Sequence, residues 1–362
     1  MLNRPIAFPV IRPERDAPST LTLARSLEGM RKEAIVITPK SAWSLLSDEG
    51  PALGGDDLAP FPLGYFAGGL AASLLDALTR LNKGGIDLSG VELMVETPYH
   101  LEGSYAKGTI RGSAMAPSIT VRAPEADRAA LRMLLHDALF ASPAFAFVRA
   151  ALANRFALSR NGTRMAIPHS IPLDPRPSPL PHFDAAPLPG AAAAASVVEK
   201  VSGDLPYTVK GSGILDTVKR AVLVEAQARI AEKGIVEAVV RLTSPQGSRF
   251  RLRAELGGET RAPSPEAYVA AGLAFCFMTQ LGRYAHTTKT SLTSAVLHQE
   301  TRVKAAEPAK GTPAAADPVL TWAFLESGAS DPEILQMLKA AERTCFLHAL
   351  CAATLRPRLA IR

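Results

Sequence analysis

Two cysteines in the C-terminal half, Cys276 and Cys345, have the clearest capacity for chemistry, and they stand 69 residues apart. Two thiols that meet can cycle between a disulfide and its reduced form. Cys276 lies in an apolar run, where a free cysteine is most often a small buried hydrophobe. Cys345 opens a predicted helix, where the helix dipole is expected to lower the pKa of its thiol and favour the thiolate. Cys351 lies outside this spacing, and we expect it to be a packing residue or a bystander thiol.

The same pattern of residues occurs twice in the chain. The first copy comprises Leu53-Gly54-Gly55, Ala59-Pro60, Pro62, Tyr65, Ala67 and Gly69-Leu70-Ala71, and each of these residues recurs 203 positions later. Under this offset Ser73 stands where Cys276 stands, and Ser142 stands where Cys345 stands. Serine keeps the shape of cysteine without its redox capability, which favours a dithiol function confined to the second copy. A repeat of this kind also predicts one fold used twice.

Composition narrows the class of protein. The chain has 362 residues, 47% of them hydrophobic, which is enough for two packed domains. Its net charge of +6 comes from scattered Lys and Arg residues rather than a dense basic stripe, so we expect no nucleic-acid partner. Three cysteines do not make a secreted disulfide framework and suit a reducing cytoplasm.

No targeting or membrane segment is predicted. Residues 1–18 contain three arginines and four prolines but no apolar run, unlike a signal peptide. The uncharged stretch from Leu58 to Leu75 has the length of a membrane span, but Pro60, Pro62 and several glycines interrupt it. We interpret it as a buried core helix, and expect a cytoplasmic protein without a membrane partner.

The elements that would position these residues follow an α+β order. In the first copy we expect a strand at 34–37, a long apolar helix at 62–81, strands at 91–96 and 118–121, a helix from Pro124 towards Ser142, and a helix at 144–156. In the second copy we expect a helix at 214–233, strands at 236–242 and 250–256, the long helix 265–286, strands within 292–303, and a helix from Pro332 to about Leu355 that breaks near Arg343-Thr344. Eight prolines between Ala166 and Gly190 predict an extended linker with neither helix nor sheet.

These residues resemble the OsmC/Ohr family of thiol-dependent hydroperoxide reductases. The family signature is a Pro-Glu near the start of a long central helix that leads to a cysteine, with a second cysteine opening a later helix. Here Pro265-Glu266 precedes Cys276 by ten residues, and Cys345 follows. The resemblance implies repeat 1 at residues 20–160, a linker at 161–201 and repeat 2 at 202–362. Each repeat would be an antiparallel sheet wrapped around a long buried helix, and the two would form an intrachain pseudo-dimer.

The resemblance also implies a mechanism without a cofactor. The Cys276 thiolate would attack an organic hydroperoxide and become a sulfenic acid, and Cys345 would condense with it to a disulfide that a cellular dithiol reduces. In the family a Glu and an Arg support the reactive thiolate, and Glu266 matches the Glu. The Arg has no assigned position, and the candidates are Arg25, Arg31, Arg220, Arg229 and Arg241.

Glu266 cannot reach Cys276 along one straight helix, because ten residues span about 15 Å. Family members are intertwined dimers, so the acid would come from the facing copy. In an internal pseudo-dimer that position is Leu63, which carries no acid. The alternative is a homodimer in which repeat 2 pairs with the repeat 2 of another chain.

Other classes of function have weaker support. Cys345 and His348 share the spacing of metal ligands, but no further ligands stand nearby, so no metal is expected. The nucleophile elbow of serine hydrolases and the Gly-rich phosphate loops are both missing from the sequence. The competing hypothesis is an OsmC-fold protein without catalysis that binds a small apolar or thiol-reactive ligand.

Overall fold

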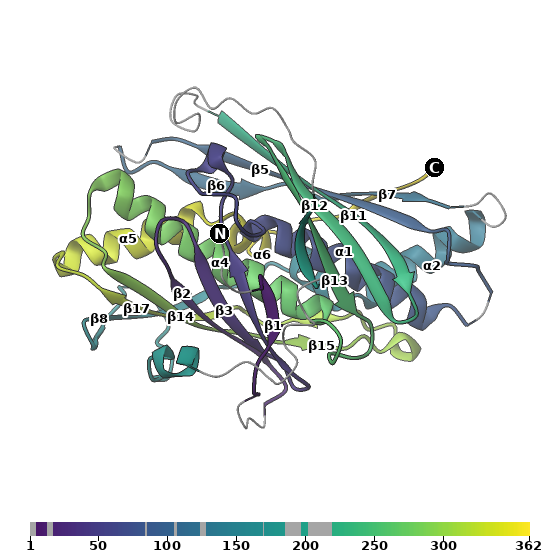
Figure 1. Ribbon diagram of the computed structural model, residues 1–362, viewed down its shortest axis with the longest axis horizontal. Helices are drawn as coiled ribbons and strands as arrows, with labels where there is room; N and C mark the ends of the chain where they lie inside the picture. Colours follow the sequence, from purple (N-terminus) through teal and green to yellow (C-terminus); the bar gives the residue numbers. More distant parts are fainter. Residues whose placement is uncertain are drawn as a thin grey trace.

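Two long apolar helices run through the middle of the molecule (Figure 1): α1 (Pro62–Leu81) and α4 (Pro265–Thr288). The computed structural model describes residues 5–12, 17–83, 85–104, 107–123, 128–168, 170–184, 197–201 and 219–362. Pro62 and Pro265 occupy first-turn positions, where the missing N–H costs nothing, and the Ser264 side chain caps α4 by accepting from Ala267 N.

The two helices cross antiparallel and touch through glycines. A Cβ atom added to Gly69 would lie 2.8 Å from the Pro265 carbonyl oxygen. One added to Gly272 would lie 2.9 Å from the Pro62 carbonyl oxygen. Backbone therefore meets backbone at this crossing, and no larger residue fits there.

Two large sheets enclose the helices (Figure 1). Sheet 1 packs on α4 and has the order β1 (Ala7–Pro9), β4 (Ala42–Ser47), β3 (Lys32–Ile37), β2 (Thr20–Ser26), β14 (Ser294–Thr301), β17 (Leu320–Glu326), β8 (Arg155–Arg160) and β9 (Thr163–Met165). Sheet 2 packs on α1 and has the order β10 (Val198–Val201), β13 (Gln246–Glu255), β12 (Ile235–Ser244), β11 (Lys219–Glu232), β5 (Glu92–Glu102), β7 (Ser118–Arg122) and β18 (Arg358–Ile361), with β6 (Arg111–Ala114) beside β5. A small ribbon pairs β15 (Val303–Lys304) with β16 (Ala315–Ala316).

Each sheet combines strands from both halves of the chain. In sheet 1, β2 of the first half pairs with β14 of the second, with Leu23 opposite His298. In sheet 2, β11 of the second half pairs with β5 of the first, with Ala226 opposite Val95. The hairpin strands of one half thus complete the sheet of the other, so neither half has a sheet of its own.

The elements recur at the spacing seen in the sequence. Helices α2 (Arg128–Ala141) and α3 (Pro143–Arg149) begin 203 residues before α5 (Asp331–Thr344) and α6 (Phe346–Cys351). The same offset separates the starts of α1 and α4, and of β8 and β18. Three short 3₁₀ turns complete the described elements: η1 (Pro51–Leu53), η3 (Leu180–Asp184) and η5 (Pro308–Lys310).

The α+β class and most predicted elements are confirmed. Helix α1 has the predicted bounds, α4 extends the prediction by two residues, and the predicted break falls between Thr344 and Phe346. Six strands also lie where the sequence predicts them: β3, β5, β7, β12, β13 and β14.

The predicted helix at 214–233 is wrong over the residues that the structure describes, because 219–232 form strand β11. Its Ala, Leu, Glu and Arg content favours a helix, but Val222, Val224, Ala226 and Ala228 are buried at every second position. The period of two prevails, because one face of this strand packs on α1. Residues 202–218 lie outside the described part.

Two further expectations are corrected. The helix predicted at 144–156 ends at Arg149, and Phe156 belongs to strand β8, where Phe156 and Leu158 alternate inward. Within the linker 161–201, the proline-rich part 166–190 contains the short 3₁₀ turn η3 where only extended chain is predicted, and β9 and β10 flank this part at sheet edges. Residues 169 and 185–196 of that segment lie outside the described part, as does a short helix expected at 191–195.

Among the described residues no single helix is both long enough and apolar enough to cross a bilayer. Helices α2 and α3 meet those criteria only when taken as one pair across a bend of 77°.

Candidate functional site

The three cysteines come together between α4 and the break separating α5 from α6. Cys276 is 2% exposed, while Cys345 and Cys351 are completely buried, and all three are free thiols. The Cys345 thiol interacts electrostatically with Cys276. Cys345 Sγ is also 3.1 Å from His348 Nδ1. We call Cys276, Cys345 and His348 the thiol site.

The local sequence explains how Cys345 meets these neighbours. It ends α5 and is the N-cap residue of α6, so its side chain lies against the first turn of α6. The ring of His348, one turn later, packs against Phe156 and Phe277 at centroid distances of 5.4 and 5.2 Å. Residues from α4, α6 and β8 therefore fix the imidazole beside the sulfur.

Burial dominates the electrostatics of the thiol site. It raises the pKa of the Cys345 thiol well above its usual value, and the neighbouring Cys276 raises it further. Backbone N–H groups of His348 and Leu347 oppose this shift only in part. The expectation that the helix start lowers the pKa of Cys345 is therefore wrong, because loss of water outweighs the short helix. Burial also lowers the pKa of His348 to about 3, so its imidazole is neutral at pH 7.

Polar groups from the first half of the chain face Cys276. Lys32, at the start of β3, is buried, and burial lowers its pKa while Glu49 and Asp48 oppose that shift. Cys276 is among the groups that interact electrostatically with this ammonium. On α4, Thr279 lies one turn after Cys276 and donates to Glu49 Oε1 at 2.9 Å. Glu49 of the first half thus contacts α4 one turn after Cys276, and Lys32 interacts with Cys276 electrostatically.

Tyr99 on β5 contributes a further polar group. Its hydroxyl is buried, and no group among the described residues lies in position to form a hydrogen bond with it. The phenol interacts electrostatically with all three cysteines. Burial raises its pKa far above the usual value, so the phenol stays protonated and can donate. His348 Nε2 is likewise buried without a partner.

At the equivalent position of the first copy, three oxygen-bearing side chains meet. Ser73 Oγ lies 2.9 Å from Ser142 Oγ, and it donates to Glu266 Oε1 at 3.2 Å. Ala144 N donates to Ser73 Oγ at 3.3 Å. We call Ser73, Ser142 and Glu266 the serine site. The antiparallel crossing of α1 and α4 thus brings Glu266 to the counterpart of Cys276, and not to Cys276 itself.

Glu266 is unusual among the carboxylates. Burial, with Asp76 and Glu259 adding to it, raises the pKa of Glu266 to about 7, while the hydrogen bond from Ser73 opposes the shift. Glu266 and Glu259 also line a pocket of about 230 Å³, together with Pro143 and Phe147. The serine site therefore has an acid and an adjoining cavity but no thiol.

The predicted site residues divide between the two sites. Cys276 and Cys345 meet in the thiol site, whereas Glu266 belongs to the serine site. Leu63, the counterpart of Glu266, is a buried core residue. His348 was considered only as a metal ligand, and no group of three or more His, Cys, Asp or Glu side chains among the described residues could hold a metal ion.

The arginine candidates have other partners. Four of them form ion pairs with glutamates: Arg25 with Glu33, Arg31 with Glu28, Arg229 with Glu237, and Arg241 with Glu225. The side chain of Arg220 lies outside the described part. The buried cation near Cys276 is Lys32. Its sequence signal was weak: a single lysine opening the apolar run 32–37.

Residues 257–358 match the family model described as OsmC-like protein. None of the curated proteins matches the chain. Two similar solved structures are an organic hydroperoxide resistance protein OsmC from Legionella pneumophila and an OsmC-like hydroperoxide resistance protein from Jannaschia sp. CCS1. The first is 20% identical over 39% of this chain and 95% of that chain, with a TM-score of 0.27. The second is 26% identical over 35% and 83%, with a TM-score of 0.19. Residues 257–358, which carry Cys276 and Cys345, thus form a domain of the OsmC-like family.

Proposed function

We propose that this protein is a thiol-dependent peroxidase that reduces organic hydroperoxides with Cys276 and Cys345. The observation that carries the proposal is that both thiols are buried where α4 packs on α5 and α6 and interact electrostatically there, although they stand 69 residues apart in the sequence. Both are free thiols, which is the form that reacts with a peroxide. A cytoplasmic dithiol would regenerate this state after each turnover.

In the first step the Cys276 thiolate attacks the terminal oxygen of the hydroperoxide. An S–O bond forms, the O–O bond breaks, and the alcohol leaves with a proton. The peroxide is reduced by two electrons, and Cys276 becomes a sulfenic acid. Lys32 interacts electrostatically with Cys276, and the Tyr99 hydroxyl can donate to an oxygen of the peroxide.

In the second step Cys345 attacks the Cys276 sulfur. An S–S bond forms, the S–O bond breaks, and hydroxide leaves as water. The backbone N–H groups of His348 and Leu347 act to lower the pKa of the Cys345 thiol, which eases the loss of its proton. The imidazole nitrogen beside this thiol is His348 Nδ1, at 3.1 Å. His348 would take this proton and pass it to the leaving hydroxide.

A groove beside the thiol site suits an organic substrate. Phe156 lines a groove of about 400 Å³ with Met165, Ile167 and Leu173. The same ring stacks on Phe277, at a centroid distance of 5.1 Å, and packs on His348. Movement of this one ring would join the apolar groove to the buried thiols.

We also propose that the chain is a duplicated OsmC-like fold, with repeat 1 at 20–160, a linker at 161–201 and repeat 2 at 202–362, forming a pseudo-dimer. The recurrence of elements at an offset of 203 and the exchange of strands between the sheets support this. The pseudo-dimer accounts for Glu266 at Ser73, since position 266 of α4 faces α1 while its counterpart on α1 is Leu63.

The test is to treat reduced protein with one equivalent of cumene hydroperoxide, quench with an alkylating agent and map the cysteine peptides. A rapid Cys276–Cys345 disulfide is expected in the native protein. The Cys345→Ser variant should accumulate sulfenic acid at Cys276, and the Cys276→Ser variant should not react. If Cys276 remains a free thiol under excess peroxide, the proposal is wrong.

A second candidate function is binding of a small ligand without catalysis. It is favoured by the pocket at the serine site and by Leu63, which leaves the thiol site without the expected acid. If the thiols do not react in the peroxide experiment, ligand binding in this pocket becomes the favoured function.

A further inference from the structure

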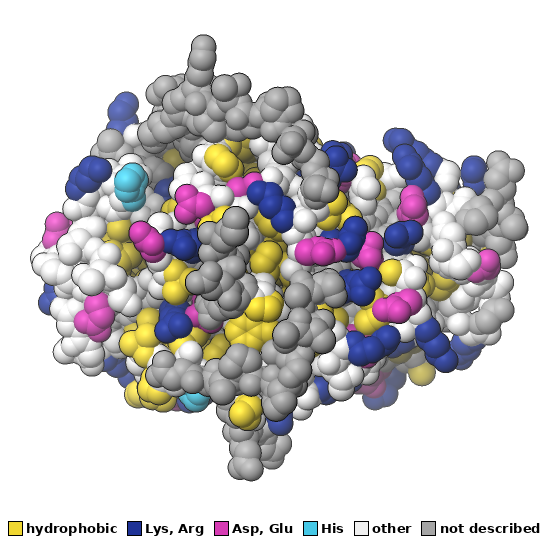
Figure 2. All heavy atoms as spheres, viewed as in Figure 1, with side chains coloured by type: hydrophobic (Ala, Val, Ile, Leu, Met, Phe, Trp, Pro, Cys, Tyr) yellow, Lys and Arg dark blue, Asp and Glu magenta, His cyan; other side chains and the backbone are white. Residues whose placement is uncertain are grey.

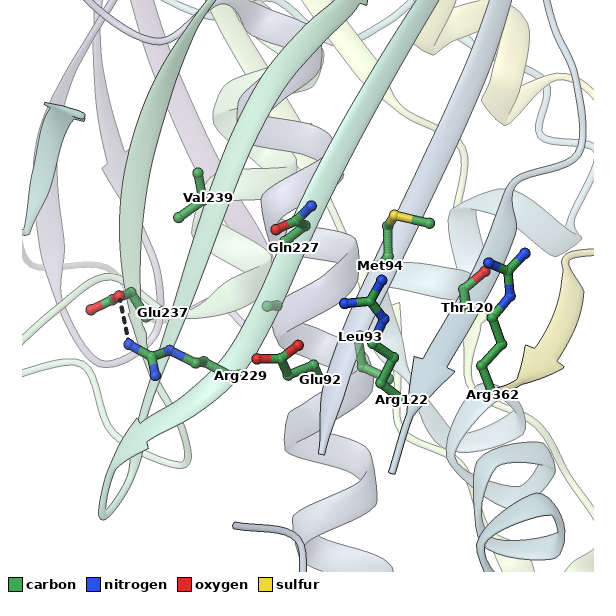
Figure 3. A pocket seen from close by; sticks show the side chains of 11 residues that line it. Glu92, Leu93, Met94, Thr120, Arg122, Gln227, Arg229, Glu237, Val239 and Arg362 are labelled. Carbon is green, nitrogen blue, oxygen red and sulfur yellow. Dashed lines mark ion pairs between the residues drawn. The ribbon is translucent and has the colours of Figure 1, made fainter. Parts of the chain in front are cut away.

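The outer face of sheet 2, on the side away from α1, carries a pocket of about 170 Å³ (Figure 3). Its walls come from β5, β7, β11, β12 and the residue after β18, and neither the thiol site nor the serine site contributes to it. Figure 2 shows Lys and Arg side chains spread over one face of the molecule, with Asp and Glu side chains between them. The pocket is therefore separate from the residues of the proposed redox chemistry.

The strand register explains how charges line this pocket. Arg229 on β11 is opposite Glu237 on β12 and Glu92 on β5, and Glu92 is opposite Arg122 on β7. Arg362 extends the row, because its backbone N–H donates to the Val121 carbonyl oxygen at 2.8 Å. Positive and negative side chains thus alternate across four strands, and the row ends on two arginines.

The neighbouring row of the same face is neutral. Gln227 is opposite Val239 and Met94, and Met94 is opposite Thr120. All four side chains line the pocket, and Figure 3 shows Gln227 and Met94 between the Arg229–Glu237 pair and the two end arginines. The floor therefore combines two apolar side chains, Val239 and Met94, with the Gln227 amide between them and the Thr120 hydroxyl at one end.

The charges around the pocket do not balance. Glu237 is shared by Arg229, Arg251 and Arg253 at N···O distances of 3.6, 3.3 and 3.8 Å. Among the residues that the structure describes, neither Arg122 nor Arg362 takes part in an ion pair. Two like charges side by side on a sheet destabilise it unless an anion lies between them.

We propose that this pocket binds a small organic monocarboxylate, with its carboxylate between Arg122 and Arg362 and its hydrocarbon body over Met94 and Val239. Arginine forks match the two oxygens of a carboxylate, and an apolar floor with a few polar groups is typical of small-molecule sites. Glu92 lies beside Arg122 in the row and opposes a second negative group, which favours a monoanion over a phosphate.

The test is calorimetric titration of the full chain with sodium octanoate. Acetate supplies the charge without the hydrocarbon body, and octylammonium supplies the body with the opposite charge. We expect octanoate to bind, and acetate and octylammonium to bind at least tenfold more weakly. Each of the variants Arg122→Gln and Arg362→Gln should weaken octanoate binding about tenfold, because each removes a charge-assisted hydrogen bond.

Arg358→Gln is the matched control, because Arg358 lies on β18, is exposed and loses the same charge outside the pocket. It should change octanoate binding less than twofold. Absence of binding, equal weakening by Arg358→Gln, or equal binding of octylammonium would each overturn the proposal. Cys276→Ser should leave octanoate binding unchanged, so this result stands apart from the peroxidase test.

Discussion

At the scale of single residues, the reactive groups are divided between two equivalent positions. The thiol site holds two sulfurs, an imidazole and a nearby ammonium, but Leu63 replaces the acid. The serine site holds the acid, Glu266, but two hydroxyls replace the thiols. Charge at the thiol site therefore depends on Lys32 and Glu49, which belong to a hairpin and a loop of the first half.

His348 should control the second step of the proposed reaction and not the first. His348→Phe removes the proton acceptor beside Cys345 and is expected to slow disulfide formation about 100-fold. Stopped-flow measurements with sulfenic-acid trapping would separate this step from oxidation of Cys276, whose rate should stay unchanged. His348→Asn keeps an acceptor oxygen that takes up no proton and should remain slow. A normal rate in His348→Asn would mean that the imidazole only orients the thiol.

Glu266 should make stability depend on pH. Its pKa is about 7 in the folded protein against an ordinary value of 4.5, so the folded state holds the proton more tightly than the unfolded state. The resulting stabilisation is complete below about pH 4.5 and is lost as the pH rises to about 7, with a size of about 3 kcal/mol.

Denaturant unfolding at several pH values would measure this effect. Glu266→Gln should abolish the fall in stability between about pH 4.5 and pH 7. Glu92→Gln, on the outer face of sheet 2, is the control and should keep it. The same pH profile in Glu266→Gln and the native protein would contradict the prediction.

At the scale of elements, the crossing of α1 and α4 sets the geometry of both sites. Glycines at the crossing let the two backbones touch, which fixes how far Glu266 reaches along α1 and which residues surround Cys276. Tyr65 packs between Tyr268 and Phe275 at centroid distances of 5.8 and 5.7 Å, so large side chains border the glycine contact. A change at the crossing should therefore move both sites together.

Gly272→Ala tests this contact. The added methyl would lie 2.9 Å from backbone atoms of α1, which cannot move aside, so we expect destabilisation of about 1–3 kcal/mol. Gly282→Ala on the same helix is the control, because nothing lies within 4 Å of its Cβ position. That variant should be neutral or up to about 1 kcal/mol more stable. Equal effects of the two variants in thermal unfolding would show that the crossing is not tight.

At the scale of the whole molecule, strand exchange makes the two halves interdependent. Strand β2 needs β14 as a neighbour, and β11 needs β5, so a separated half would expose sheet edges and the faces of its long helix. An internal pseudo-dimer already buries these surfaces within one chain. We therefore expect a monomer in solution, and an obligate dimer through repeat 2 would contradict the pseudo-dimer.

A chain divided between residues 190 and 191 tests the interdependence. Each fragment alone should lack a cooperative unfolding transition, because its sheets are incomplete. Mixed fragments should recover the far-ultraviolet circular dichroism of the intact protein and elute as one complex. Independent folding of either fragment would show that its strands do not need the other half.

The sequence alone predicted the class, the long helices and the two cysteines, because these follow from local signals: apolar runs, first-turn prolines, and a repeat offset that pairs Ser73 with Cys276 and Ser142 with Cys345. It failed for strand β11, whose composition favours a helix while its packing on α1 imposes a period of two. It also missed Lys32, Tyr99 and His348, because nothing in their local sequence distinguishes them from ordinary core or loop residues.

Only the tertiary structure decided which groups meet. The sequence limited Glu266 to a position away from Cys276, because a helix rises by a fixed amount per residue. The antiparallel crossing then brought this acid to Ser73, and strand exchange brought Lys32 and Tyr99 towards the thiols. The depressed pKa of His348 and the raised pKa of Cys345 likewise come from burial by residues distant in the chain. Local sequence therefore determined which side chains could react, and packing between the halves determined their neighbours and their charge.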